Sequence, residues 1–169
     1  MRHSPAEETE VTNATTTGRR IEYGTIAPEG AAAVRALEQY VRKCGLEKPL
    51  LELVKLCASY MNGCAYCVDM HTKDARAEGE TEQRLYAVPV WRETPFFTPR
   101  ERAALAWTEA VTELGRDGVS DQLFDETSEH FTERELADLT YAVIVINCWN
   151  RLSVALGSNV GSYQPPKHG

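Results

Sequence analysis

Residues 63–71 read Gly-Cys-Ala-Tyr-Cys-Val-Asp-Met-His, with two cysteines three positions apart and a histidine four positions after the second. Asn62-Gly63 is a turn signal, and helical sequence follows from Cys64 onward. Both thiols therefore lie in the first turn of the predicted helix, where free backbone N–H groups and the helix dipole favour a thiolate. Cys67 and His71 are four positions apart, so their side chains share one face of that helix. A thiol beside a proton acceptor at a helix start is typical of a nucleophilic cysteine.

Two interpretations of an isolated C-x-x-C pair compete, a redox dithiol and half of a metal site. Structural zinc takes four ligands, usually as two pairs from separate segments. The sequence holds no second C-x-x-C or H-x-x-H pair, and the spacing of Cys57, Cys148 and His130 does not suggest a fourth ligand. We therefore expect a redox pair, with no metal and no cofactor. Free cysteines are usually buried, so Cys44, Cys57 and Cys148 are interpreted as small core residues.

Glu52 lies in the preceding predicted helix, and the residues alone leave two roles open for it. With Lys55 it could form an i, i+3 ion pair on a solvated face. Alternatively, it faces the following helix and holds the proton released by Cys67 or His71. Glu52, Lys55 and Ser59 form a narrow polar stripe on a helix that is otherwise apolar, so most of that helix is expected to be buried.

The composition of the whole chain is that of one soluble domain. The chain has 169 residues, of which 43% are hydrophobic and 25% charged, and its formal net charge is −7. This acidic balance argues against nucleic acid as a partner, because phosphate binding needs a basic patch. We expect no membrane span, since no apolar run is long enough, and no secretory signal, since residues 1–20 lack an apolar core. Five cysteines at irregular spacing indicate a reducing compartment, and we expect a cytoplasmic protein.

Helix signals recur along the chain, and no credible strand pair interrupts them. Proline opens two helices, at Pro28 and Pro49, and capping boxes begin two others, at residues 98–101 and 132–135. We predict an all-α, single-domain bundle of about six to seven helices. The predicted helices cover residues 28–44, 49–61, 64–78, 81–91, 98–115, 120–131 and 132–157.

The two ends of the chain differ in composition from this helical part. Residues 1–20 are rich in Glu, Thr and Ser and nearly free of large apolar side chains, which predicts a disordered or loosely attached arm. Residues 21–26 carry a few apolar side chains and are expected to dock as an extended segment. Residues 158–169 contain two prolines and are expected to form an irregular tail. The helical domain is therefore predicted to span residues 21–157.

Polar and aromatic residues break the apolar run of the last predicted helix. They either line a pocket near the dithiol or contact another subunit, because Trp and Arg are common in subunit contacts. Tyr66, between the two cysteines, is a candidate for the same two roles. The candidates in the helix are Asn147, Trp149, Asn150 and Arg151.

The candidate catalytic residues follow the pattern E, eleven residues, C-x-x-C, three residues, H, beginning at Glu52. This pattern resembles that of the alkylhydroperoxidase D-like proteins of the carboxymuconolactone decarboxylase superfamily. The likeness is strongest in residues 51–76 and extends to residues 101–108 and 147–152. It covers most of residues 21–157.

The resemblance implies an all-helical, AhpD-like fold assembled as trimers or hexamers, with peroxidase chemistry through the dithiol. In family terms, Cys67 attacks the peroxide and Cys64 resolves the product. Glu52 and His71 would form a proton relay. The best-known members carry a histidine immediately before the second cysteine, where this chain has Tyr66, a poor base at neutral pH, so the relay must rely on Glu52 and His71. The decarboxylases of the superfamily lack the C-x-x-C pair, and decarboxylation is not expected.

The sequence thus predicts a dithiol peroxidase with antioxidant activity of the alkyl hydroperoxide reductase type. Its expected partners are a hydroperoxide substrate and a dithiol reductant, either a lipoylated or a thioredoxin-like protein, and it is expected to be a homo-oligomer. Spacing alone does not decide which cysteine attacks first, since the first cysteine of many C-x-x-C enzymes is the exposed nucleophile. The alternative is a non-enzymatic helical oligomer whose dithiol senses redox state or binds a metal.

Overall fold

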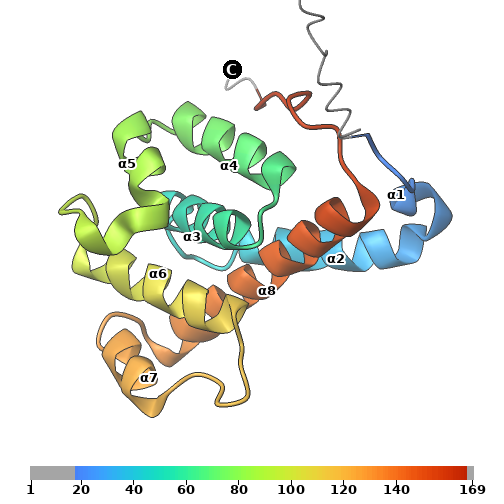
Figure 1. Cartoon of the computed structure of the whole chain (residues 1–169). Coiled ribbons are helices and arrows are strands. Elements are labelled where there is room, and N and C mark those ends of the chain that lie inside the picture. Colours follow the sequence, from blue (N-terminus) through green and yellow to red (C-terminus); the bar gives the residue numbers. More distant parts are fainter. Residues whose placement is uncertain (1–17, 167–169) are drawn as a thin grey trace, which may run out of the picture.

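The computed structural model describes residues 18–166, and every regular element in this range is helical (Figure 1). The described residues form eight α-helices and one 3-10 helix, η1. The predicted all-α class is confirmed, and the number of helices is close to the six to seven expected. The elements are α1 (Tyr23–Ile26), α2 (Pro28–Val41), α3 (Lys48–Met61), α4 (Ala65–Ala77), α5 (Glu82–Ala87), η1 (Val88–Glu93), α6 (Pro99–Thr112), α7 (Asp121–Ser128) and α8 (Glu133–Leu156).

The long helices α6 and α8 begin where the sequence signals place them. At α6, the Thr98 hydroxyl accepts the N–H of Glu101, and the Glu101 carboxylate accepts the N–H of Thr98. Thr132 and Glu135 make the same reciprocal pair at α8. Each capping box satisfies N–H groups that the helix itself leaves free, so local sequence determines where these two helices start.

Two segments differ from their predicted structure. Residues 81–91 do not form one helix, because α5 ends before Pro89 and this proline lies in η1. Proline lacks the N–H that an α-helix needs and clashes with the carbonyl group four residues earlier, so the α-helix cannot continue. Residues 21–26 are not extended, because hydrogen bonds to the carbonyl oxygen of Glu22 close the short helix α1.

Helix α3 is the central helix of the bundle and contacts α4, α6 and α8 (Figure 1). One apolar cluster joins α3 to α2, α6 and α8, and it includes Val54, Ala104 and Leu139. A second cluster joins α3 to α5, η1 and α6, and it includes Leu56 and Leu105. Burial of these side chains provides most of the driving force for this packing. The predicted burial of α3 is thereby confirmed.

The polar stripe of α3 also lies inside the bundle. Lys55 is 2% exposed and Ser59 has no exposed surface. Lys55 is bonded to Glu38 of α2, and Ser59 to Asn150 of α8, so two other helices reach this side of α3. Glu52 and Lys55 do form an ion pair. The expectation that this pair lies on a solvated face is wrong, because the lysine is buried.

Helix α8 has 24 residues and is long and apolar enough to meet length and composition criteria for a membrane span. This differs from the expectation that no apolar run is long enough. The buried core helix of a soluble protein meets the same criteria. Because α8 packs against α2, α3 and α6 in the centre of the bundle, we interpret it as such a core helix (Figure 1).

The chain just before α1 is attached to the end of α8. The backbone N–H of Arg20 donates to the carbonyl oxygen of Leu156 at 2.7 Å. Gly157 has a φ of +80°, and a Cβ atom there would lie 2.5 Å from the carbonyl oxygen of Gly18. Only glycine fits this junction, because any side chain would meet backbone that cannot move aside.

The tail after α8 runs without a helix over residues 158–166. It is attached to α4, because the hydroxyl of Tyr163 donates to Asp74 at 2.6 Å. Most of the predicted N-terminal arm, residues 1–17, lies outside the described residues, as does the end of the predicted tail, residues 167–169.

Candidate active site at the start of helix α4

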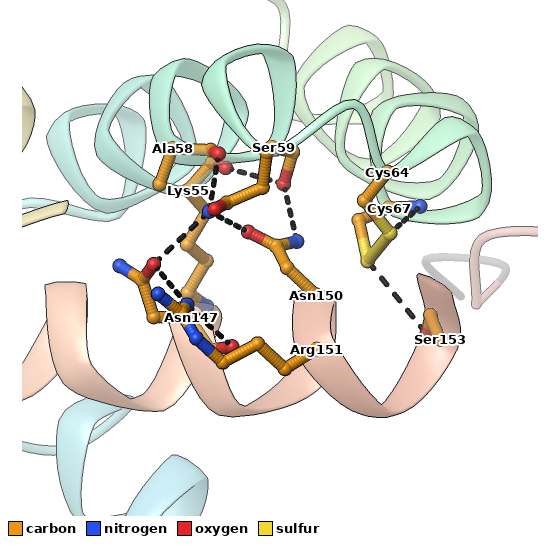
Figure 2. The surroundings of a disulfide bond; sticks show 10 residues. Lys55, Ala58, Ser59, Cys64, Cys67, Asn147, Asn150, Arg151 and Ser153 are labelled. Atoms are coloured by element: carbon orange, nitrogen blue, oxygen red, sulfur yellow. Dashed lines mark hydrogen bonds between the residues drawn. A yellow bond between two sulfur atoms is a disulfide. The ribbon is translucent and has the colours of Figure 1, made fainter. Parts of the chain in front are cut away.

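The two cysteines of the C-x-x-C pair lie at the start of α4 (Figure 2). Cys64 is the N-cap residue, and its Sγ atom accepts the backbone N–H of Cys67 at 3.3 Å. The preceding turn contains Gly63 with a φ of +63°, a left-handed conformation that favours glycine. The two sulfur atoms form a disulfide, and the Cα atoms are 5.3 Å apart. The predicted placement of both thiols at a helix start is confirmed.

The disulfide is almost completely covered by protein. Both cysteines are 1% exposed and belong to a small buried cluster with Ala58 and Ile146, against which the partly buried rings of Tyr66 and Trp149 pack. A pocket of about 290 Å³ opens beside Cys64, and its lining includes Tyr66 and Ser153. A reactant can therefore approach the sulfur pair from this side.

Ser153 of α8 is a site residue that is absent from the sequence predictions. Its Oγ atom lies 3.9 Å from the Sγ atom of Cys67 (Figure 2). Ser153 follows Asn150 by three positions, so the two polar side chains lie on the same face of α8. This i, i+3 pair in a mostly apolar helix is the sequence signal that could have identified it.

Glu52 and His71 meet across the interface between α3 and α4. The Nδ1 atom of His71 lies 2.8 Å from the Oε2 atom of Glu52. A carboxylate can only accept hydrogen bonds, so the proton of this bond lies on Nδ1, and Nε2 of the neutral ring is an acceptor. His71 is 4% exposed, and its Nε2 has no hydrogen-bond partner in residues 18–166. A buried nitrogen that can accept a proton is thus held one turn from Cys67 on the same helix.

No hydrogen bond joins His71 to Cys64 or Cys67 within the described part of the chain. The two halves of the predicted relay are therefore not joined by a hydrogen bond. The sulfur pair lies at the start of α4, and the carboxylate–imidazole pair lies about one turn later. Proton transfer between them stays a prediction.

Lys55 extends the carboxylate–imidazole pair into a line of alternating charges. Its Nζ atom lies 2.8 Å from Glu38 and 3.6 Å from Glu52. Burial alone would raise the pKa of Glu52, but the hydrogen bond from His71 and the charge of Lys55 outweigh it and hold that pKa below its ordinary value. Glu52 is therefore ionised at neutral pH. Glu52 therefore pairs with Lys55 and also contacts His71 of the following helix, and its role in holding a proton stays a prediction.

A second polar network holds the turn before Cys64 against α8 (Figure 2). The side-chain amide of Asn62 donates to the Oδ1 atoms of Asn147 at 3.0 Å and Asn150 at 2.9 Å. Asn150 in turn donates to the Oγ atom of Ser59 at 3.1 Å. Buried polar groups need partners, and this set is satisfied only when α8 and the turn keep their present register. The network therefore positions the dithiol relative to α8.

The five residues predicted for a pocket or a subunit contact have different surroundings. Asn150 has no exposed surface, so it cannot line a pocket or contact another subunit in this arrangement, and both predicted roles are corrected to an internal link. Asn147 is partly buried and accepts a hydrogen bond from Arg151 as well as the one from the turn. Tyr66 and Trp149 pack against the buried cluster that includes the two cysteines. Of the five, only Tyr66 lines the pocket beside the dithiol.

A second pocket, of about 200 Å³, has a lining that includes Glu52, Lys55, Asp74 and Tyr163. The ligand atoms of Glu52, His71 and Asp74 lie within 4.8 Å of one another, close enough to hold a metal ion. However, Nδ1 of His71 is bonded to Glu52, and Asp74 accepts the hydroxyl of Tyr163. The ammonium group of Lys55 also lies beside Glu52 and would repel a cation. We therefore interpret the group as an ion-pair network.

Comparison with known proteins places these features in a family context. Residues 28–110 match the model of the Carboxymuconolactone decarboxylase family. The chain is 42% identical over 144 residues to the uncharacterized protein YdfG of Bacillus subtilis (strain 168), an alignment that covers 85% of this chain and 98% of that protein.

Two solved structures have a similar fold. The first, from Agrobacterium tumefaciens, is a protein of unknown function described as a candidate antioxidant defence protein AhpD. It is 43% identical with a TM-score of 0.80, and the match covers 89% of this chain and 100% of that one. The second is the debrominase Bmp8, which is 20% identical with a TM-score of 0.72, covering 82% of this chain and 74% of that one. At that identity, the likeness to Bmp8 concerns the fold alone.

Proposed function

The chain belongs to the carboxymuconolactone decarboxylase family and has an AhpD-like fold, and we propose that it is a dithiol peroxidase that reduces hydroperoxides. The observation that carries the proposal is the Cys64–Cys67 disulfide at a helix start, near the buried Glu52–His71 pair. A thiol pair that can close supplies the two electrons of peroxide reduction, and a nearby imidazole can supply the proton transfer.

We assign the first step to Cys67. In the reduced protein, the helix start favours the thiolate form of this side chain. Its sulfur attacks the terminal oxygen of the hydroperoxide, so that an S–O bond forms while the O–O bond breaks and its electron pair leaves with the alkoxide. The alkoxide takes up one proton and departs as an alcohol. Cys67 is left as a sulfenic acid.

Cys64 completes the reduction. Its thiolate attacks the sulfenic sulfur of Cys67, forming the S–S bond and expelling hydroxide, which is protonated to water. In the closed pair the Cα–Cα distance is 5.3 Å, within the ordinary range for a disulfide. In sum, one hydroperoxide and two thiols become one alcohol, one water and one disulfide.

His71 is the group that we expect to carry protons in these steps. Nε2 of the neutral ring can accept a proton, and the carboxylate of Glu52 at Nδ1 stabilises the imidazolium that results. Burial works against the charge of Glu52, but His71 and Lys55 keep the pKa of this carboxyl low, so it stays ionised. Glu52 therefore orients and stabilises the imidazole, and His71 acts as the general acid and base.

A second dithiol has to reopen the disulfide before the next turnover. We propose a lipoylated or thioredoxin-like protein as this reductant, approaching Cys64 from the pocket beside it, in the reducing environment of the cytoplasm. We also propose a homo-oligomer, a trimer or hexamer. Apolar side chains remain on the outer face of α8, where Tyr141 is 45% and Ile144 is 40% exposed, and such a face is suited to a subunit contact.

The alternative function is a non-enzymatic redox sensor whose dithiol closes without turnover. A shared fold does not determine the reaction, since the fold of this chain also occurs in a debrominase. A metal-binding function has less support, because the Lys55 ammonium lies beside the carboxylate that would have to bind the cation.

The test adds one equivalent of an organic hydroperoxide to the reduced, metal-free protein. We expect the intact mass to fall by two hydrogens, with peptide mass spectrometry locating the new disulfide at Cys64–Cys67. Repeated turnover in the presence of a dithiol reductant distinguishes an enzyme from a sensor. Oxidation scattered over Cys44 and Cys148 instead would show that the pair is not tuned for peroxide.

The roles of the two cysteines are tested with single Cys→Ser variants and a reagent that traps sulfenic acids. Cys67→Ser should consume no peroxide, and appreciable residual consumption by this variant would contradict its role. In Cys64→Ser, the label should appear on Cys67. A label found on Cys64 in Cys67→Ser, with no label on Cys67 in the other variant, would reverse the two roles.

A further inference from the structure

The hydroxyl of Ser153 has an unusual partner for a serine inside a helix. Ser59, Thr108 and Thr127 each donate to the carbonyl oxygen four residues earlier at 2.7 Å, the usual partner of a buried helical hydroxyl. In residues 18–166, Ser153 makes no such bond, and its Oγ atom is instead hydrogen-bonded to the Sγ atom of Cys67. This side chain is thus directed at the sulfur and away from its own helix (Figure 2).

The contact with Ser153 is the hydrogen bond that the described residues show at the sulfur of Cys67. Nε2 of His71 makes no hydrogen bond to this sulfur or to any other group in residues 18–166. A buried negative sulfur without a donor is costly, so a hydroxyl at this place has a clear electrostatic effect.

We propose that Ser153 is a catalytic residue of the dithiol centre, its hydroxyl donating a hydrogen bond to the sulfur of Cys67 when that sulfur is negative. The inference rests on the proposed peroxidase function. Reduction breaks the S–S bond, but Cys67 stays on α4 and Ser153 stays on α8, and these two helices are packed against each other. The hydroxyl therefore remains beside the thiolate. A hydrogen bond to a charged acceptor is stronger than one between neutral groups, and this favours the thiolate over the thiol.

The serine hydroxyl keeps its own proton during the reaction. As the S–O bond forms and the O–O bond breaks, negative charge moves from the sulfur of Cys67 to the departing oxygen, whose proton comes from the imidazolium of His71. Ser153 increases the fraction of reactive thiolate at neutral pH. Ser153 and Cys64 both line the pocket beside the dithiol, so the hydroxyl lies where an entering hydroperoxide meets the sulfur pair.

Helix α8 holds Ser153 in this position through its neighbour Asn150. Asn150 is fully buried and bonded to Asn62 and Ser59, on the turn and helix that precede the dithiol. Because Asn150 and Ser153 share a face of α8, a rotation that withdrew the hydroxyl from the sulfur would also break these bonds. The same contacts that position the turn therefore position the donor.

The variants Ser153→Thr and Ser153→Val test the proposal, because their side chains have nearly the same shape and only threonine carries a hydroxyl. Both are made in a Cys64→Ser background, so that Cys67 is the thiol of the pair that titrates. Ser128→Ala, at an exposed position of α7, is the control for loss of a serine hydroxyl. Ultraviolet absorbance of the thiolate is followed against pH in each reduced protein. We expect the midpoint to be kept in Ser153→Thr and to move to higher pH in Ser153→Val.

The second readout is the rate of disulfide closure by an organic hydroperoxide, measured with both cysteines present. At neutral pH we expect Ser153→Val to close about tenfold more slowly than Ser153→Thr. Equal midpoints in the two variants, with both folded by circular dichroism, would overturn the proposal. If Ser153→Val does not fold, Ser153→Ala replaces it in the same comparison.

The two readouts separate this inference from the function on which it rests. The thiolate titration needs no peroxide, so it judges the hydrogen bond of Ser153 directly. Failure of the peroxidase function would show instead in the unmodified protein, as a reduced Cys64–Cys67 pair that does not close when hydroperoxide is added.

Discussion

The Nδ1 atom of His71 lies 2.8 Å from the Oε2 atom of Glu52, so a side chain of α4 is bonded to one of α3 across their interface. This bond determines the tautomer of a buried imidazole and leaves its Nε2 as an acceptor. The same carboxylate is also close to the buried ammonium of Lys55. Reactivity at the dithiol and stability of the fold therefore depend on the same glutamate.

Replacing Glu52 with glutamine should slow disulfide closure by hydroperoxide about 10²-fold at neutral pH. The amide keeps the size of the side chain but carries no charge, so an imidazolium at His71 loses the partner that stabilises it. Closure is followed by stopped-flow mixing of the reduced protein with an organic hydroperoxide. Glu93→Gln, at an exposed position of η1, is the matched control. If Glu52→Gln closes as fast as this control, the carboxylate has no role in the relay.

The stability of the protein should fall in acid because of two partly buried carboxylates. Burial alone would raise the pKa of Glu38 and of Glu52, but Lys55 lowers the first and His71 with Lys55 lowers the second, so both lie below the ordinary value of 4.5. A group whose pKa is lower in the folded than in the unfolded state contributes stability above the unfolded pKa. That contribution is lost as the pH falls through the folded pKa.

We therefore expect the free energy of unfolding in urea to be steady above about pH 5 and to decrease as the pH drops below about 4.5. In Glu38→Gln, part of this decrease should disappear, because one of the two carboxylates no longer titrates. Urea midpoints measured across this range check the expectation. The ordinary pKa of these carboxyl groups is 4.5. If the free energy of unfolding rises as the pH falls below this value, the inferred direction of the two pKa shifts is wrong.

Lys55→Met should reduce the free energy of unfolding by about 3 kcal/mol. Methionine fills a similar volume, but Glu38 and Glu52 then lose the cation between them in a buried setting, since the lysine side chain is 3% exposed. The double variant Lys55→Met/Glu38→Gln should be less destabilised than the sum of the two single changes, because it removes one of the unpaired charges. Additive losses would show that the line of charges is not coupled. Lys43→Met, at an exposed position, is the control.

Local signals in the sequence are sufficient to predict the helices and the sulfur pair. The capping boxes at Thr98 and Thr132 form as expected, and Gly63 makes the turn before α4. Capping and turn conformations depend on residues a few positions apart, so one sequence is enough to identify them. The C-x-x-C pair lies within a single turn, and its geometry is predictable for the same reason.

Contacts between distant segments are not predictable in this way. Ser153 lies 86 positions from Cys67, and nothing in its neighbourhood shows that its face of α8 meets the start of α4. Periodicity indicates which residues share a helix face, but it does not show which helix that face contacts. The burial of Lys55 is missed for a related reason, because its partner Glu38 lies on α2 and only the packing of the bundle brings the two together.

Asn150→Ala should lower the free energy of unfolding by about 1–3 kcal/mol, as expected when buried polar groups lose their partner. The variant leaves the amide of Asn62 without one acceptor and the hydroxyl of Ser59 without its donor, next to the turn that carries Cys64. We therefore also expect slower disulfide closure by hydroperoxide. Asn159→Ala, at an exposed position in the tail, is the control and should change neither quantity.

The mass of the native oligomer separates this structural role from a subunit contact. Because Asn150 has no exposed surface, the Asn150→Ala variant should keep the mass of the unmodified protein in native mass spectrometry. Loss of stability and slower closure at constant mass would support the internal link between α8 and the dithiol turn. A variant of unchanged stability that assembles into a smaller oligomer would show that this asparagine acts between subunits.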